Sequence, residues 1–166
     1  AKMDAGDIIA KKTTSISLEE NAGELEKRLS IMGADLLIET LDAIEAGRAT
    51  YTKQEENEVS FAPKIKKENG LIAWPQETHN VHNRIRGMTP SHGAYTYHSQ
   101  SASGEKKRIV VLKTQIHDTS KIKTFFTPGT IIETAPCGIH VATLDGPICI
   151  TRLQQEGKRE MDAQEY

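Results

Sequence analysis

The sequence lacks the features that mark membrane and secreted proteins. Among its 166 residues, no apolar run approaches the length needed to span a bilayer. The first four residues are polar and do not form the apolar segment of a signal peptide. Hydrophobic residues make up 37% and charged residues 27%, so a packed core is possible and wholesale disorder is not expected. We therefore expect a globular chain with no membrane partner.

Cysteine is also scarce, and its scarcity argues against a disulfide-bonded or metal-binding protein. Cys137 and Cys149 are the two cysteines, and both lie in apolar, strand-like stretches. This predicts two buried, reduced thiols and a cytoplasmic location. His79 and His82 lie three apart on an expected helix, but no third ligand or cysteine cluster accompanies them in the sequence. No metal site is predicted.

Charge is distributed unevenly along the chain although the net charge is only -2. Residues 1–62 hold seven Lys or Arg and thirteen Asp or Glu, whereas residues 63–166 hold fourteen and ten. An acidic N-terminal part and a basic C-terminal part indicate two units with different partners, and the second unit would bind an anion. Ordinary scatter of charge is the alternative.

The front part reads as a strand followed by a long helix. Residues 7–16 are rich in β-branched side chains and predict a strand. Asn21 and Glu24 have the spacing of a helix capping box. Apolar residues then recur at spacings of three and four, as on one face of an amphipathic helix: Leu25, Leu29, Met32, Leu36, Leu37, Leu41 and Ile44. Gly33 is expected to interrupt the helix and Gly47 to end it.

The next residues, 48–60, are polar and acidic and predict a linker. One strand and one helix cannot form an independent sheet. Residues 1–46 are therefore either an appendage or part of a larger chain, and a first residue other than Met weakly favours the second interpretation.

The back part has one short helix and a series of β patterns. The helix is expected to begin at Pro75, to carry Val81 and Ile85 on one face, and to end at Gly87. Strands are predicted at residues 94–97, 108–116, 130–133, 138–144 and 147–153. Asp145-Gly146 predicts a two-residue hairpin loop between the last two, and residues 161–166 resemble the start of another helix. This series predicts a small barrel of the oligonucleotide-binding type.

Two groups of residues could carry chemistry. Asp4 lies in a turn with Gly6 close behind, where a carboxylate can orient a histidine or water and a glycine lets a planar ligand approach; such turns are also common without function. Basic residues recur at the edges of the predicted elements: Lys64, Lys66, Lys67, Arg84, Arg86, Lys106, Lys107 and Arg108. They fit phosphate contacts, or a solvated surface. Trp74 and Tyr95 could stack on bases, although the apolar context of Trp74 favours a place in the core.

In order and spacing, several short motifs resemble the methionyl-tRNA formyltransferase family over essentially the whole chain. They are Met3-Asp-Ala-Gly-Asp-Ile-Ile9, Asn21-Ala-Gly-Glu-Leu25, Gly33-Ala-Asp-Leu-Leu37, Phe61-Ala-Pro-Lys-Ile-Lys-Lys67, Ile85-Arg-Gly87, Gly93-Ala-Tyr95, Pro128-Gly-Thr-Ile131, Val141-Ala-Thr143 and Gln155-Glu-Gly-Lys158. One departure is Pro90-Ser91-His92, which stands where the family has Pro-Trp-Pro.

The resemblance implies an α+β fold in three parts. Residues 1–47 would be the terminal strand and helix of a Rossmann-like catalytic domain, residues 48–63 a linker, and residues 64–166 a small oligonucleotide-binding-like β-barrel that binds tRNA. The chain would be the downstream part of a monomeric enzyme.

The resemblance also implies a reaction, the transfer of a formyl group from 10-formyltetrahydrofolate to the methionine amine of initiator methionyl-tRNA. In the family an Asn and a His polarise the formyl oxygen and an Asp orients the His. That Asp corresponds to Asp4, while the Asn and His would lie upstream of residue 1, so this chain alone is expected to be inactive. Met3, Ala5 and Gly6 would contact folate. Lys64, Lys66 and Lys67, then Arg84 and Arg86, are the first candidates for tRNA contacts.

Two other functions stay open. The first is a different folate-dependent formyltransferase, or a formyl-folate hydrolase, of the same family. The second is a free-standing nucleic-acid-binding module with a helical arm. The expected strand at residues 7–16 argues against the module, because it has no partner sheet within this sequence.

Overall fold

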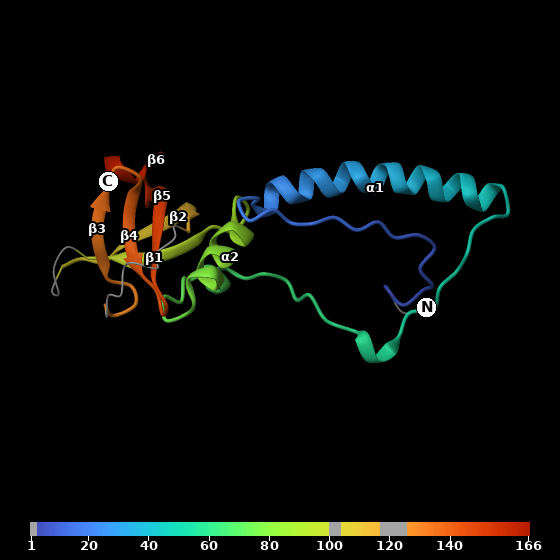
Figure 1. Ribbon diagram of the computed structural model, residues 1–166, viewed down its shortest axis with the longest axis horizontal. Helices are drawn as coiled ribbons and strands as arrows, with labels where there is room; N and C mark the ends of the chain where they lie inside the picture. Colours follow the sequence, from blue (N-terminus) through green and yellow to red (C-terminus); the bar gives the residue numbers. More distant parts are fainter. Residues whose placement is uncertain (1–2, 100–103, 117–125) are drawn as a thin grey trace. The chain divides into compact units, whose positions relative to one another are not determined.

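The computed structural model describes residues 3–99, 104–116 and 126–166 (Figure 1). It separates into two compact units. The first unit comprises Ala1–Leu18 and Glu24–Lys64, and the second comprises Glu19–Gly23 and Ile65–Tyr166.

The first unit is built on one long helix, α1 (Ala22–Glu45). It begins directly after Asn21 and ends before Gly47, whose φ of 64° is the left-handed conformation predicted for a helix-terminating glycine. The expected interruption at Gly33 is wrong, because α1 continues through it. A glycine inside a helix costs only about 1 kcal/mol relative to alanine, which a helix of this length can absorb.

The predicted strand at residues 7–16 is also wrong. Within the described part of the first unit, this segment forms one isolated bridge, in which Ile8 and Thr52 exchange backbone hydrogen bonds of 2.8 and 2.9 Å. The remainder runs as an extended segment alongside α1 (Figure 1), where Arg28 binds Thr14 and the carbonyl of Ser15. β-branched residues favour an extended backbone, but a strand also needs a neighbouring strand to satisfy its hydrogen bonds. The stretch 48–60 holds a single 3₁₀ turn, η1 (Glu56–Glu58).

The second unit contains the short helix α2 (Thr78–Met88). Val81 and Ile85 are buried on one face of it, as predicted. Its limits differ from the prediction, because it begins three residues after Pro75 and includes Gly87. A carboxylate from a distant loop accounts for the start: the backbone N–H and the hydroxyl of Thr78 both donate to Asp145 Oδ1 at 2.7 Å. This contact satisfies a free N–H at the beginning of the helix.

In the described part of this unit, six antiparallel strands form one sheet, which places it in the α+β class. They are β1 (Ala94–His98), β2 (Lys107–Gln115), β3 (Ile131–Ala135), β4 (Gly138–Ala142), β5 (Pro147–Gln155) and β6 (Glu160–Asp162). The order is β1-β2-β5-β4-β3, with β6 also paired to β5. Each of the five predicted strands therefore corresponds to an observed one. The chain ends in a 3₁₀ turn, η3 (Ala163–Glu165), so the helix expected at residues 161–166 is wrong.

The hairpin between β4 and β5 is confirmed, but its predicted two-residue loop is wrong. Ala142 pairs with Pro147, so four residues form the loop. Its geometry is set by Thr143, whose N–H and hydroxyl both donate to the carbonyl of Gly146, at 2.8 and 2.6 Å. The longer loop lets Asp145 reach α2.

The core of the second unit lies between α2 and one face of the sheet. Its buried side chains include Ile72, Val81, Ile85, Ala94, Val111, Ile148 and Leu153. Trp74 packs against this core, and its Nε1–H donates to Thr96 Oγ1 at 3.0 Å, which confirms the core interpretation of Trp74. Among the described residues, neither α1 nor α2 has the length and apolarity required to cross a membrane.

Candidate functional site

The loop that holds Asp4 is exposed and has an unusual backbone. Asp4 has a φ of 59°, in the left-handed region that costs energy for residues other than glycine. Gln54 secures this turn, because its Nε2 donates to the carbonyls of Asp4 and Gly6 at 3.0 and 2.7 Å. The Asp4 side chain is left facing solvent, as are Met3 and Ala5. The loop therefore presents an exposed carboxylate on a turn that two hydrogen bonds from Gln54 hold in place.

Sequence reasoning missed Gln54, which lies within the expected linker. A glutamine in a polar stretch carries no periodic or motif signal, and its contact with Asp4 spans 50 residues of chain. The structure thus ties part of the stretch 48–60 to the candidate catalytic loop.

Three of the five candidate tRNA-binding residues gather around η2 (Lys67–Gly70). The backbone N–H of Lys66 donates to Asn69 Oδ1 at 2.7 Å, and Arg84 Nη1 donates to the carbonyl of Asn69 at 3.2 Å. Lys66, Lys67 and Arg84 are therefore neighbours, and all three are exposed. Exposed cations that lie close together are one arrangement that can contact phosphates.

The other two candidates differ from this group. Lys64 is the last residue of the first unit, whereas η2 belongs to the second. Arg86 is partly buried and makes structural contacts. Its Nε donates to Asn83 Oδ1, and its Nη1 donates to the carbonyl of Glu20, both at 2.8 Å. Arg86 thus fastens the segment Glu19–Gly23 to α2, and its guanidinium is already engaged.

Aromatic side chains continue the basic surface onto β1 and β2. Tyr97 pairs with Arg108 across the strands, and the Arg108 guanidinium lies 4.3 Å from the centre of the Tyr95 ring. Tyr95 and Tyr97 meet edge to face at 5.8 Å, and Tyr97 is 53% exposed. Leu71, which follows η2, forms an isolated parallel β-bridge with Tyr95. Guanidinium and tyrosine side chains side by side suit a strand of nucleic acid, since cations meet phosphates and rings stack on bases.

The histidine pair on α2 is not a ligand pair. His82 is 2% exposed, and its Nδ1 is 2.9 Å from Thr114 Oγ1, while His79 is exposed. A buried histidine with a hydroxyl partner belongs to the core.

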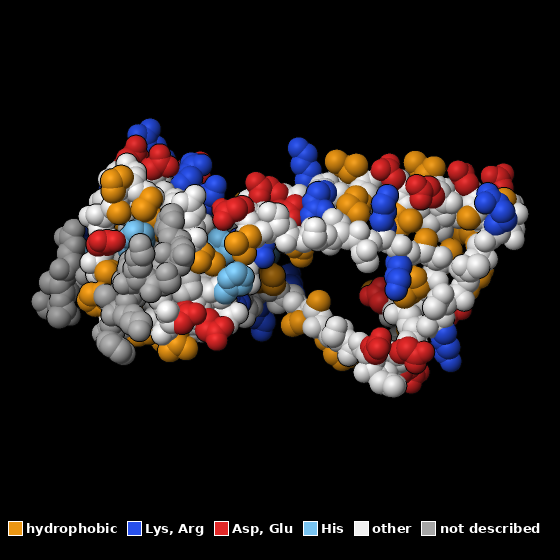
Figure 2. All heavy atoms as spheres, in the orientation of Figure 1, with side chains coloured by type: hydrophobic (Ala, Val, Ile, Leu, Met, Phe, Trp, Pro, Cys, Tyr) orange, Lys and Arg blue, Asp and Glu red, His pale blue; other side chains and the backbone are white. Residues whose placement is uncertain are grey.

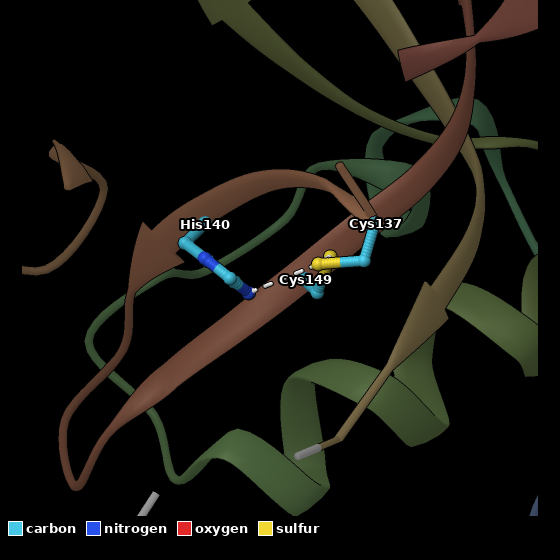
Figure 3. Close-up of side chains that lie close together, drawn as sticks. All are labelled: Cys137, His140 and Cys149. Carbon is cyan, nitrogen blue, oxygen red and sulfur yellow. Dashed lines mark hydrogen bonds between the residues drawn. The ribbon is translucent and has the colours of Figure 1, made fainter. Parts of the chain in front are cut away.

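A different cluster can hold a metal ion. Cys137, His140 and Cys149 place their ligand atoms within 4.8 Å of one another (Figure 3). Cys149 is buried, as predicted, but Cys137 is partly exposed, because it lies in the turn between β3 and β4. Burial of Cys149, together with Cys137 beside it, raises the pKa of the Cys149 thiol to about 12. The sequence analysis considered the two histidines that are close together on one helix. This cluster instead combines Cys137 and His140, spaced as Cys-x-x-His, with Cys149 on the neighbouring strand β5.

Comparison with known proteins gives three findings. Residues 64–166 match the family model described as the formyl transferase C-terminal domain. The chain is 39% identical over 164 residues to methionyl-tRNA formyltransferase of Geotalea daltonii. It is 36% identical over 166 residues to the enzyme of the same name in Natranaerobius thermophilus. Each alignment covers 99% of this chain and 49% or 51% of the relative, so the chain spans about half the length of these relatives.

Solved structures of HypX from Aquifex aeolicus share the fold. A multiple-site variant aligns with a TM-score of 0.66 at 18% identity, and the complex with tetrahydrofolic acid with a TM-score of 0.64 at 18% identity. Each alignment covers 99% of this chain and 28% of HypX.

Proposed function

The chain belongs to the formyl transferase C-terminal domain family, and from this premise we propose that it forms the C-terminal half of a methionyl-tRNA formyltransferase. The enzyme would transfer the formyl group of 10-formyltetrahydrofolate to the methionine amine of initiator methionyl-tRNA, as a monomer in the cytoplasm. One observation carries the proposal. The identity of 36–39% to enzymes of that name extends through 99% of the chain, so it includes the Asp4 loop and α1 as well as residues 64–166.

We assign a separate task to each part of the chain. Residues 1–47 would complete a Rossmann-like catalytic domain, residues 48–63 would link the two domains, and residues 64–166 would form an oligonucleotide-binding-like barrel. Support for the first task comes from α1, which exposes a row of apolar side chains (Figure 2): Ile31, Leu37, Ile38, Leu41 and Ile44 are each more than 40% exposed. Such a face is typical of a helix that packs on a sheet.

The tRNA would lie on the surface formed by η2, α2 and the outer face of β1 and β2. Lys66, Lys67 and Arg84 supply positive charge there, and Arg108 with Tyr95 and Tyr97 supplies a cation beside two aromatic rings. Because these contacts address phosphates and base faces, they would bind tRNA largely without reading its sequence. Lys64 would add positive charge where the linker ends, and Arg86 would hold α2 in place.

Asp4 would serve the transfer itself. The methionine nitrogen attacks the formyl carbon, a tetrahedral intermediate forms, and it collapses as the C–N bond to tetrahydrofolate breaks. The attacking nitrogen loses a proton and the folate nitrogen gains one. An exposed carboxylate on a fixed turn can orient the histidine that the family places at this centre and assist this proton movement. Met3, Ala5 and Gly6 would line the folate side of the same turn.

The test uses the full-length protein that contains this chain, and measures formyl-methionyl-tRNA formation with Asp4→Asn. The expected loss in kcat is roughly 10²–10⁴-fold with KM changed far less, because the isosteric amide cannot carry the charge. Asp7→Asn, three residues away and also exposed, is the matched control and should retain parental kcat. A kcat within threefold of the parent would show that Asp4 is only a turn residue.

The parent protein in the same assay tests the overall function. If it formylates a different amine, or hydrolyses 10-formyltetrahydrofolate without an acceptor, another member of the family is indicated. Residues 1–166 alone should show no transfer, because a lone carboxylate lacks the partners that acid-base catalysis requires.

A further inference from the structure

Three neighbouring strands align a carboxylate, an imidazole and a thiol in one row. Glu133 on β3 pairs with His140 on β4, and His140 pairs with Cys149 on β5. Residues opposite each other in antiparallel strands point to the same face of the sheet. Cys149 therefore faces away from Ile148 and Ile150, which belong to the core cluster, and yet it is 1% exposed. The buried thiol lies on the other face of the sheet from that core.

A tight turn brings a second thiol to this row. Ala135 pairs with Gly138, so Pro136 and Cys137 alone connect β3 to β4. Gly138 has a φ of 144°, and a Cβ there would lie 2.0 Å from the carbonyl oxygen of Ile150. Only glycine allows the turn to approach β5 so closely. The approach places Cys137 Sγ 3.4 Å from Cys149 Sγ and 3.7 Å from His140 Nε2.

We propose that Cys137, His140 and Cys149 bind a zinc ion. Tetrahedral zinc with Zn–S bonds of about 2.3 Å and Zn–N bonds of about 2.0 Å holds two thiolates roughly 3.8 Å apart and a thiolate and an imidazole nitrogen roughly 3.6 Å apart. The observed separations of 3.4 and 3.7 Å are close to these values. The third separation, between Cys149 Sγ and His140 Nε2, is within 4.8 Å, and the side chains would close around the ion to shorten it. Water would occupy the fourth position.

The surroundings of His140 support this assignment. Its Nδ1 lies 3.0 Å from Glu133 Oε1, while Nε2 faces Cys137 (Figure 3). A carboxylate that accepts a hydrogen bond from Nδ1–H fixes the tautomer in which Nε2 can bind a metal, as it does at many zinc sites. Two thiolates with one imidazole favour zinc over the hard ions magnesium and calcium. Zinc binding releases one proton from each of the two thiols, so one Zn²⁺ ion takes the place of two protons.

A disulfide is the main alternative occupant of the same position. The two sulfurs are 3.4 Å apart, well beyond the bond length of about 2.05 Å. A disulfide also gives no role to the aligned Glu133 and His140, whereas zinc uses both. The ion would fasten the turn between β3 and β4 onto β5.

The experiment measures zinc in the full chain, purified under reducing conditions, by elemental analysis and by competition with a chromogenic chelator. One zinc per chain is expected, and cobalt(II) in its place should give the visible absorption bands of a tetrahedral thiolate site. Cys137→Ser and His140→Gln should each weaken zinc binding at least a hundredfold. Glu133→Gln should weaken it roughly 10–100-fold, because it loses only the group that orients His140.

His92→Gln is the matched control, since His92 is an exposed histidine of the same unit, and it should bind zinc as the parent does. Circular dichroism should show the same fold for every variant, and zinc should raise the Tm of the parent but not of His140→Gln. Equal affinity of the parent and His140→Gln would overturn the proposal. So would a reduced parent that binds no zinc and, in air, loses both thiols to a disulfide.

Discussion

The two units of this chain differ in what fixes their backbone. In the first, α1 runs for 24 residues and none of them is buried. Its neighbouring segment, residues 7–16, makes one bridge and a few side-chain contacts. In the second unit, α2 has only 11 residues, yet it buries Val81, Ile85 and Met88 against a six-stranded sheet. The longer helix, α1, thus has the sequence signals of a helix but little packing, whereas the shorter helix, α2, is held by a hydrophobic core.

This contrast explains why similar runs of β-branched residues form a strand in the second unit but not in the first. β-branched residues at 108–116 form a strand, because β1 and β5 pair with it on both sides. The comparable residues at 7–16 do not, because among the described residues their backbone hydrogen bonds are those between Ile8 and Thr52. The free energy that orders a strand comes from its partners and its packing more than from its own propensity.

The largest expected difference between the units is in amide hydrogen exchange. Residues 108–115 and 147–155 should exchange only through global unfolding of the second unit, which for a small domain costs on the order of 5–15 kcal/mol. Residues 9–16 should exchange almost freely, because their amides make few backbone bonds. Measurement by mass spectrometry on the full chain will test this, and equal protection of both regions would mean that the units fold as one.

The next largest effect compares two isoleucines, each within a helix. Ile85 on α2 is 1% exposed and Ile38 on α1 is 61% exposed. Ile85→Ala should lower the free energy of unfolding by about 2–5 kcal/mol through lost burial and the cavity left behind. Ile38→Ala should change it by less than about 0.5 kcal/mol in this chain. Urea unfolding gives both values, and a large loss for Ile38→Ala would reveal a partner for the apolar face of α1.

A third comparison concerns one pair of lysines in each unit. Lys66-Lys67 lies at η2 beside Arg84, and Lys11-Lys12 is an equally exposed pair in the first unit. Each phosphate contact contributes about −0.7 to −0.9 to the slope of log K against log salt, so replacing Lys66 and Lys67 with Ala should flatten the slope for tRNA by roughly 1.5. The same change at Lys11 and Lys12 should leave it as it was. Identical slopes for both variants would mean that η2 is only a solvated surface.

The candidate sites show where sequence reasoning stops. The turn at Asp4 and the lysines at η2 are each local in sequence, so the sequence alone could propose both, whereas the place of Arg84 beside the lysines came from the structure. Gln54 could not, because its bonds to the Asp4 loop depend on how distant segments meet. The same holds for Cys137 and Cys149, which required the register of β4 against β5 to bring them together. Strand register is a property of the sheet and is not visible in one segment.

The smallest expected effect concerns Asp145, which the sequence marked only as part of a hairpin loop. It accepts hydrogen bonds from the backbone N–H and the hydroxyl of Thr78 at 2.7 Å, and so caps α2 from the loop between β4 and β5. Burial by itself would raise the pKa of this carboxyl, but the hydrogen bonds from Thr78 and Thr143 outweigh it and hold the pKa below its usual value. The charged form is therefore favoured in the folded protein.

Asp145→Ala should lower the free energy of unfolding by about 0.5–2 kcal/mol at neutral pH, the usual cost of a lost helix cap. Asp145→Asn should lose less, because its amide oxygen still accepts a hydrogen bond. Since the folded pKa is depressed, the charge-dependent stabilisation is complete above the unfolded pKa of about 3.9 and disappears as pH falls through the folded value. Thermal unfolding of the parent and Asp145→Asn from pH 7 to pH 2 should give two curves that converge at the acid end. Curves that stay parallel would show that hydrogen-bond geometry, and not the charge of Asp145, supports α2.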